Sequence, residues 1–141
     1  RRARHPQRAN RSETVSEHFS PATDLRLFSC GCDRPECKVP APSSLLLAML
    51  EVMRRVYGAA ILVTSGPRCA FWNAHEGGKP ESEHLTGEGA DLACPSSTVR
   101  WAMLEAAHAA GFLRVGIGAS FMHVGVSRTL AQRVVWTYYP G

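Results

Sequence analysis

Hydrophobic residues recur along this chain with two periods, which predict helices alternating with short strands. Residues 44–57 carry apolar side chains every three or four positions, a spacing typical of an amphipathic helix. Two serines sit where helix caps belong, and Gly58 follows as a stop. Residues 97–108 show similar spacing and are closed by Gly111. Both segments are therefore predicted to be helices, the first with its apolar side in the core.

Short runs rich in apolar and β-branched residues predict strands. In the run 121–126, Phe121, His123 and Gly125 share one face, so His123 points away from the aliphatic face. The expected strands cover residues 25–28, 60–64, 91–94, 113–117, 121–126 and 134–138. The order of elements lacks a regular βαβ repeat. The predicted fold class is therefore α+β, a small mixed or antiparallel sheet flanked by helices.

Length and composition predict one compact domain at residues 15–141. A chain of 141 residues with 45% hydrophobic content can build one core without disulfides. No apolar run approaches the roughly 20 residues of a membrane helix, so we expect a soluble protein. The net charge of +4 comes from arginines within the first eleven residues. We interpret residues 1–14 as a basic flexible tail and expect no specific nucleic-acid partner.

The stretch 82–91 carries the strongest chemical signal. His84 and Asp91 stand seven residues apart, with only small residues immediately before Asp91. Zinc readily binds neutral imidazole and carboxylate, and catalytic zinc sites commonly combine three protein ligands with a water. The third ligand predicted here is His123, on the non-aliphatic face of its strand.

Several separated motifs together resemble the M15 zinc peptidases, the D-alanyl-D-alanine carboxypeptidase group. In chain order they are Ser65-Gly66-Pro67-Arg68-Cys69, Gly77-Gly78, the stretch 82–91 and Phe121-Met122-His123-Val124. The resemblance covers roughly residues 16–136. It implies the hedgehog/DD-peptidase-like fold, one catalytic zinc ion held by His84, Asp91 and His123, and an Arg68 that faces the substrate.

The chain departs from the family pattern at two places. Position 89 is Gly where the family usually has Ala. Position 125 is Gly where the most similar relatives tend to carry Asp, and Ser120 stands where others carry an acid. No Asp or Glu follows Glu105. The last strands therefore cannot supply a carboxylate that activates the attacking water.

The general base is not identified by the sequence. It must lie within hydrogen-bond reach of the water it activates. The remaining groups are Glu88, Glu83, Glu76 and His75, and none has a distinct claim. Zinc itself lowers the pKa of its water, so weak hydrolysis without a dedicated base stays open. A zinc-binding module that has lost catalysis is the alternative.

Three residues are predicted to bind substrate. Arg68 suits a peptide's terminal carboxylate or the charge that develops on an attacked carbonyl. Ser82 either hydrogen-bonds the substrate or holds its own loop. His75 lies in a loop that should border the site, where it either assists binding and proton transfer or is simply solvated.

Five cysteines raise a separate question. Cys30, Cys32 and Cys37 lie close enough in sequence to form part of a second, structural zinc site. A fourth ligand would then have to be Cys69, Cys94 or a histidine. The alternatives are a disulfide within the cluster, a pair between Cys69 and Cys94, or plain thiols.

We therefore expect a zinc metallopeptidase that hydrolyses peptidoglycan stem peptides, as a D-Ala-D-Ala carboxypeptidase or a related, endolysin-like endopeptidase. The first alternative is a catalytically weak or inactive zinc-binding module for cell wall or protein. The second is a different hydrolase or a phage structural component on the same fold. The bacterial envelope and phage are the favoured settings. Nothing resembles a coiled-coil seam, so we expect a monomer.

Overall fold

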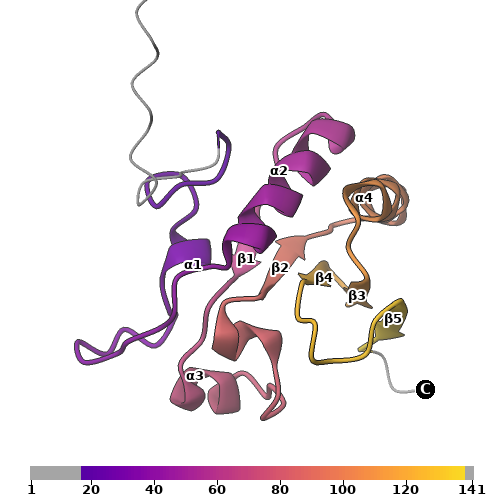
Figure 1. Cartoon of the computed structure of the whole chain (residues 1–141). Coiled ribbons are helices and arrows are strands. Elements are labelled where there is room, and N and C mark those ends of the chain that lie inside the picture. Colours follow the sequence, from indigo (N-terminus) through magenta and orange to yellow (C-terminus); the bar gives the residue numbers. More distant parts are fainter. Residues whose placement is uncertain (1–16, 139–141) are drawn as a thin grey trace, which may run out of the picture.

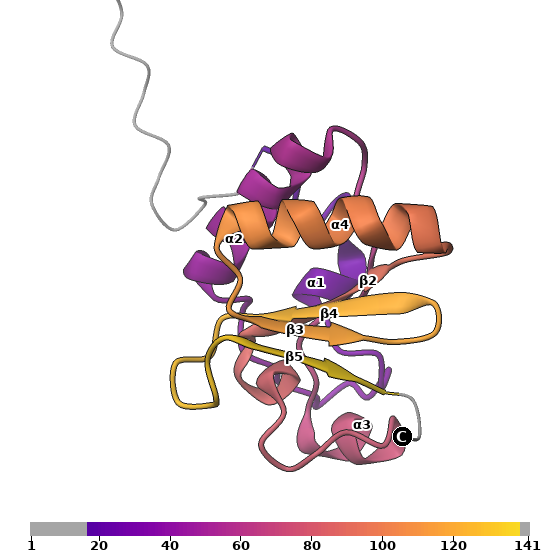
Figure 2. The ribbon, with the colours of Figure 1, turned by 90° about the vertical axis from the view of Figure 1, so that its right-hand side faces the viewer.

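The computed structural model describes residues 17–138, which form a mixed five-stranded sheet with helices on both sides (Figures 1 and 2). The strand order is β1-β2-β4-β3-β5, and all neighbours are antiparallel except β3 and β5. The strands are β1 (Val63–Ser65), β2 (Gly89–Ala93), β3 (Arg114–Ile117), β4 (Phe121–Gly125) and β5 (Val134–Thr137). The predicted α+β class is confirmed. The predicted tail at residues 1–14 lies outside the described residues.

Four α-helices and one 3-10 helix accompany the sheet within residues 17–138. They are α1 (Leu25–Phe28), α2 (Ser44–Tyr57), α3 (Ala70–His75), η2 (Glu83–Thr86) and α4 (Ser97–Ala110). The two long helices match the predicted segments, with boundaries within about two residues. None of the helices in the described part of the chain combines the length and apolar character needed to cross a membrane.

The ends of α2 and α4 follow from their flanking residues. The Ser43 hydroxyl accepts a hydrogen bond from the Leu46 amide, and the Ser96 hydroxyl accepts one from the Val99 amide. Gly58 and Gly111 close the helices in the left-handed conformation, with φ of +77° and +92°. Local chemistry therefore fixes the length of both helices.

The core lies between the sheet and the pair α2 and α4, which pack against each other on one side of it (Figure 2). Leu46, Leu50 and Met53 of α2 are fully buried, and Met122 and Val124 of β4 are buried as well. Because side chains alternate along a strand, the residues between them point to the opposite face. That face of β2 and β4 carries the polar residues described below.

The strand predicted at residues 25–28 is wrong, because this segment is the one-turn helix α1. Its backbone bonds are local: the Leu27 amide donates to the Asp24 carbonyl, and the Asp24 amide donates to the Ser20 carbonyl. Only Leu27 of the four residues is buried, whereas Leu25 is largely exposed. A short apolar run fits either a strand or a helix turn, so periodicity could not separate them.

The strand predicted at residues 60–64 begins later, at Val63. Leu62 is mostly exposed, although its carbonyl still accepts a hydrogen bond from the Ala93 amide at 2.9 Å. The pairing of β1 with β2 also shifts register between Val63 and Ser65. The irregular edge shortens the strand and brings Ser65 to its end, just before Arg68.

Candidate active site

The three residues predicted to bind zinc, His84, Asp91 and His123, lie together on the sheet face opposite the helical core. One ligand atom from each lies within 4.8 Å of the other two, and all three residues are buried. Asp91 of β2 and His123 of β4 are paired across the antiparallel ladder. Cross-strand neighbours have their Cβ atoms about 5 Å apart, so this register alone brings the two side chains together.

His84 comes from η2, and its position depends on that short helix. The Ser82 hydroxyl caps η2 by accepting a hydrogen bond from the His84 amide at 3.2 Å. Gly87 ends η2 in the left-handed conformation, with φ of +73°. The Nδ1 of His84 lies 2.6 Å from the Gly66 carbonyl, which can only accept, so Nδ1 carries the hydrogen. Nε2 is therefore the nitrogen that faces Asp91, whose Oδ1 is 3.2 Å away; it donates to this carboxylate when the ring is protonated and offers a lone pair when the ring is neutral.

His123 has a carboxylate at each ring nitrogen. Its Nδ1 lies 2.9 Å from Oδ1 of Asp91, and its Nε2 lies 3.0 Å from Oε1 of Glu83. Burial lowers the pKa of His123, but the hydrogen bonds to Asp91 and Glu83 outweigh burial and raise it above its ordinary value. Burial likewise opposes ionisation of Asp91, yet hydrogen bonds from His123 and His84 hold the pKa of its carboxyl well below the usual range.

This donor set fits a zinc ion. Two imidazole nitrogens and one carboxylate oxygen converge, and each histidine has its other ring nitrogen engaged by an acceptor. Such outer partners fix the orientation of ligating histidines in metal sites. His84 would bind through Nε2, His123 through Nδ1 and Asp91 through a carboxylate oxygen, which leaves room for a water or substrate as catalytic sites require.

Glu83 holds His123 in place. Besides His123, its carboxylate accepts hydrogen bonds from Nε of Arg114 and from the Ser127 amide, both at 2.9 Å. Burial opposes its ionisation, but the hydrogen bond from His123, followed by that from Ser127, lowers its pKa. The side chain of Glu83 is only 2% exposed. Because three donors occupy this carboxylate, it suits a positioning role better than that of a general base.

Gly89 and Gly125, the two positions at which the chain departs from the expected motif, both lie next to Glu83. A Cβ atom at position 125 would lie 2.0 Å from Oε2 of Glu83, and one at position 89 would lie 2.7 Å from Cε1 of His123 and 2.8 Å from the Cβ of Glu83. Gly125 is therefore required while the Glu83 side chain keeps this conformation, and Gly89 is required while His123 and Glu83 keep their present positions. The sequence offered Glu83 only as one of several acids. The signal that could have singled it out was the joint occurrence of Gly89 and Gly125.

Arg68 lies beside the three predicted ligands. Its Nη2 is 3.3 Å from Oδ2 of Asp91, and its Nε donates to the Ser65 hydroxyl at 3.1 Å. The Arg68 amide donates to the His84 carbonyl at 2.8 Å, which joins the β1–α3 loop to η2. The guanidinium thus stands where it could meet a carboxylate or a polarised carbonyl.

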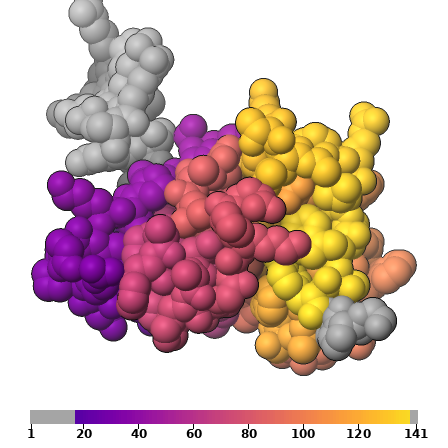
Figure 3. Space-filling model, turned by 90° about the horizontal axis from the view of Figure 1, so that it is seen from below, coloured from indigo at the N-terminus to yellow at the C-terminus, as the bar shows by residue number. Residues whose placement is uncertain are grey.

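Two cavities meet at Asp91 and Arg68. The first, of about 480 Å³, runs toward Ser29 and Gly31, and the second, of about 590 Å³, includes His84 and His123. The second is bounded by residues 76–84 and 130–138, and these two segments lie side by side on the face shown in Figure 3. The predicted ligands therefore stand where an extended molecule could pass on both sides.

The remaining predicted residues differ in whether they line one of the two cavities. Ser82 lines the second cavity, while His75 lines neither cavity and stacks on Trp72 with ring centroids 4.6 Å apart. Glu88 accepts a hydrogen bond from Thr86 and also lines neither cavity. Of the candidate bases, Glu76 lines both cavities. The substrate-binding roles of Ser82 and His75 stay predictions.

The family model for Peptidase M15 matches residues 17–127. This range includes the three predicted ligands, Arg68 and Glu83. A comparison with curated proteins gives no match. The family match supports a hydrolase of the metallopeptidase class, in agreement with the donor set of the site.

Proposed function

Because this chain belongs to the Peptidase M15 family, we propose that it is a zinc-dependent peptidase that hydrolyses peptidoglycan stem peptides. The scissile bond is a D-Ala-D-Ala bond or another bond that involves a D-residue. The observation that carries the proposal is the convergence of His84, Asp91 and His123, with Arg68 bound to Asp91, at the junction of two cavities. The site of action is then the bacterial cell wall, for a host or a phage protein.

Each residue has a distinct task in the proposed reaction. His84, Asp91 and His123 would hold a zinc ion, which would supply a water of lowered pKa and polarise the scissile carbonyl. Arg68 orients the peptide by binding a terminal carboxylate or a carbonyl oxygen, because a guanidinium offers two parallel donors. Glu83 keeps the ring of His123 in one orientation. The cavities on both sides of Asp91 hold residues that flank the scissile bond.

The general base is proposed to be Glu76. It lines both cavities together with Arg68 and Asp91, whereas Glu83 is occupied by three donors and Glu88 lines neither cavity. We expect Glu76→Gln to lower kcat about 100-fold or more and to leave zinc content unchanged, in the range of measured general-base effects. Glu81→Gln is the matched control, because Glu81 lines only the second cavity. Equal activity of both variants would remove Glu76 from this role.

Mass spectrometry of muropeptides tests the proposal. Purified muropeptides, including pentapeptide stems, are incubated with zinc-loaded protein and with its His84→Ala variant. We expect a single defined product from the parent protein alone, and its mass identifies the bond. Intact muropeptides from a parent that still binds zinc at this site would overturn the proposal and favour a binding module.

A further inference from the structure

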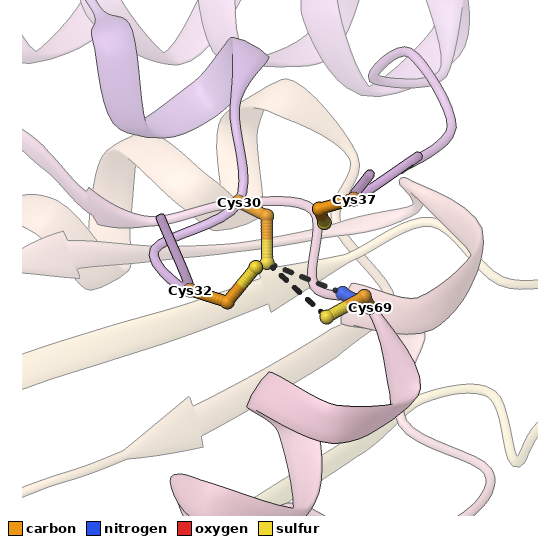
Figure 4. Close-up of side chains that lie close together, drawn as sticks. All are labelled: Cys30, Cys32, Cys37 and Cys69. Carbon is orange, nitrogen blue, oxygen red and sulfur yellow. Dashed lines mark hydrogen bonds between the residues drawn. The ribbon is translucent and has the colours of Figure 1, made fainter. Parts of the chain in front are cut away.

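Four of the five cysteines lie together outside the hydrophobic core. Cys30, Cys32 and Cys37 belong to the loop between α1 and α2, and Cys69 caps the N-terminus of α3 (Figure 4). All four sulfur atoms lie within 4.8 Å of one another. The fifth cysteine, Cys94, is buried in the hydrophobic core and does not join them.

The spacing of the sulfur atoms matches a metal site. A tetrahedral zinc ion with Zn–S bonds of ~2.3 Å separates its sulfurs by ~3.8 Å. The Sγ atoms of Cys30 and Cys69 are 3.6 Å apart, which is much longer than the ~2.05 Å of a disulfide bond. All four cysteines are free thiols in this structure. They are also partly exposed, so packing of apolar thiols in a core does not explain their meeting.

Backbone amides support the cluster. The Cys69 amide donates to the sulfur of Cys30, and the Trp72 amide donates to the sulfur of Cys69, both at 3.4 Å. Hydrogen bonds to ligand atoms are typical of the surroundings of metal sites, where they orient the ligands. Two of the four sulfurs therefore already have such partners.

We propose that Cys30, Cys32, Cys37 and Cys69 bind a second, structural zinc ion. Four thiolates favour zinc or an iron-sulfur cluster over harder ions, and a set of four protein ligands leaves no open position for a substrate. The site is therefore structural, and it does not depend on the proposed peptidase activity.

The ion would join the loop before α2 to the region that carries Arg68. Cys69 directly follows Arg68, and the loop already contacts α3 at two points. A Cβ atom at Gly31 would lie 2.7 Å from the indole nitrogen of Trp72, and the Arg34 guanidinium lies 4.7 Å from the ring centroid of Phe71. The ion thus fixes a wall of the first cavity, which includes Gly31, Arg68 and Trp72.

Metal counting on the zinc-loaded protein provides the test. We expect two zinc ions per chain in the parent, one in the His84→Ala variant, one in Cys32→Ser and two in the control Cys94→Ser. Cobalt exchanged into the His84→Ala variant should show thiolate-to-metal charge-transfer absorption, because only the sulfur site then holds metal. Cys32→Ser should lose that absorption.

If a cysteine variant misfolds, measurements on the parent protein still test the inference. Alkylation of the denatured, unreduced parent should modify all five cysteines, as confirmed by intact mass. One zinc ion per parent chain with none in His84→Ala would overturn the inference. So would a disulfide within the cluster, or the visible absorption of an iron-sulfur cluster in the purified protein.

Discussion

At the residue scale, Glu83 and the two glycines beside it determine how His123 is held. The resemblance led us to expect an acid at position 125, and here Gly125 leaves that space to the carboxylate of Glu83. The acid therefore comes from η2 instead of β4, and it reaches the outer ring nitrogen of His123 at 3.0 Å. The sequence correctly excludes an acid from the last strands, but it cannot show that one arrives from elsewhere in the chain.

Loss of the Glu83 carboxylate should weaken metal binding at His84, Asp91 and His123. We expect Glu83→Gln to lower zinc affinity at this site about 10- to 100-fold, the range found for outer partners of ligating histidines. Competition with a chromophoric chelator measures it, with Glu88→Gln as control because Glu88 is half-buried, accepts a hydrogen bond from Thr86 and lines neither cavity. Equal affinity in parent and Glu83→Gln would refute the positioning role.

The glycine at position 125 should be tied energetically to Glu83. Gly125→Asp places a side chain 2.0 Å from Oε2 of Glu83, so we expect it to lower the free energy of unfolding by about 1–3 kcal/mol, as overpacking does. In the Glu83→Ala background the same change should cost much less, because the space is then empty. Urea denaturation of the single and double variants measures this coupling. If the two changes in the free energy of unfolding were additive, position 125 and Glu83 would not be coupled, and the prediction would be wrong.

At the scale of elements, the register between β2 and β4 brings Asp91 and His123 together. Alternation along the run 121–126 placed His123 away from the aliphatic face, and the pairing of Asp91 with His123 confirms that face. Neither α3 nor η2 was predicted. Both are too short for a periodic pattern, and their boundaries depend on the caps Cys69 and Ser82. The complete cysteine cluster could not be predicted from the sequence either. Sequence spacing groups only Cys30, Cys32 and Cys37, whereas Cys69 joins them through the tertiary fold.

The β1–α3 loop should act through Arg68. We expect Arg68→Ala to lower kcat/KM about 100-fold or more with unchanged zinc content, since loss of one group that stabilises a developing oxyanion costs about 10²–10³. Arg68→Lys should recover little, because an ammonium cannot replace a bidentate guanidinium. Hydrolysis of a synthetic stem pentapeptide measures both. Full activity of Arg68→Ala would show that the loop only closes the cavity wall.

At the scale of the whole molecule, one face of the sheet forms the hydrophobic core and the other forms the candidate site. One face packs on α2 and α4 and carries the apolar core, while the other carries the three predicted ligands and the cavities beside them. The helical layer was predictable because its apolar side chains repeat along the sequence and its caps are local. The cavities were not, because they depend on how residues 76–84 and 130–138 come together.

The most direct measurement is the rate of hydrolysis of a synthetic stem pentapeptide by zinc-loaded parent protein and by its Asp91→Asn and His123→Ala variants, with bound zinc counted in each. The proposed site predicts turnover by the parent, and loss of both turnover and one zinc ion in each variant. Unchanged turnover in variants that have lost this ion would contradict it, as would a parent that holds zinc here and leaves the peptide intact.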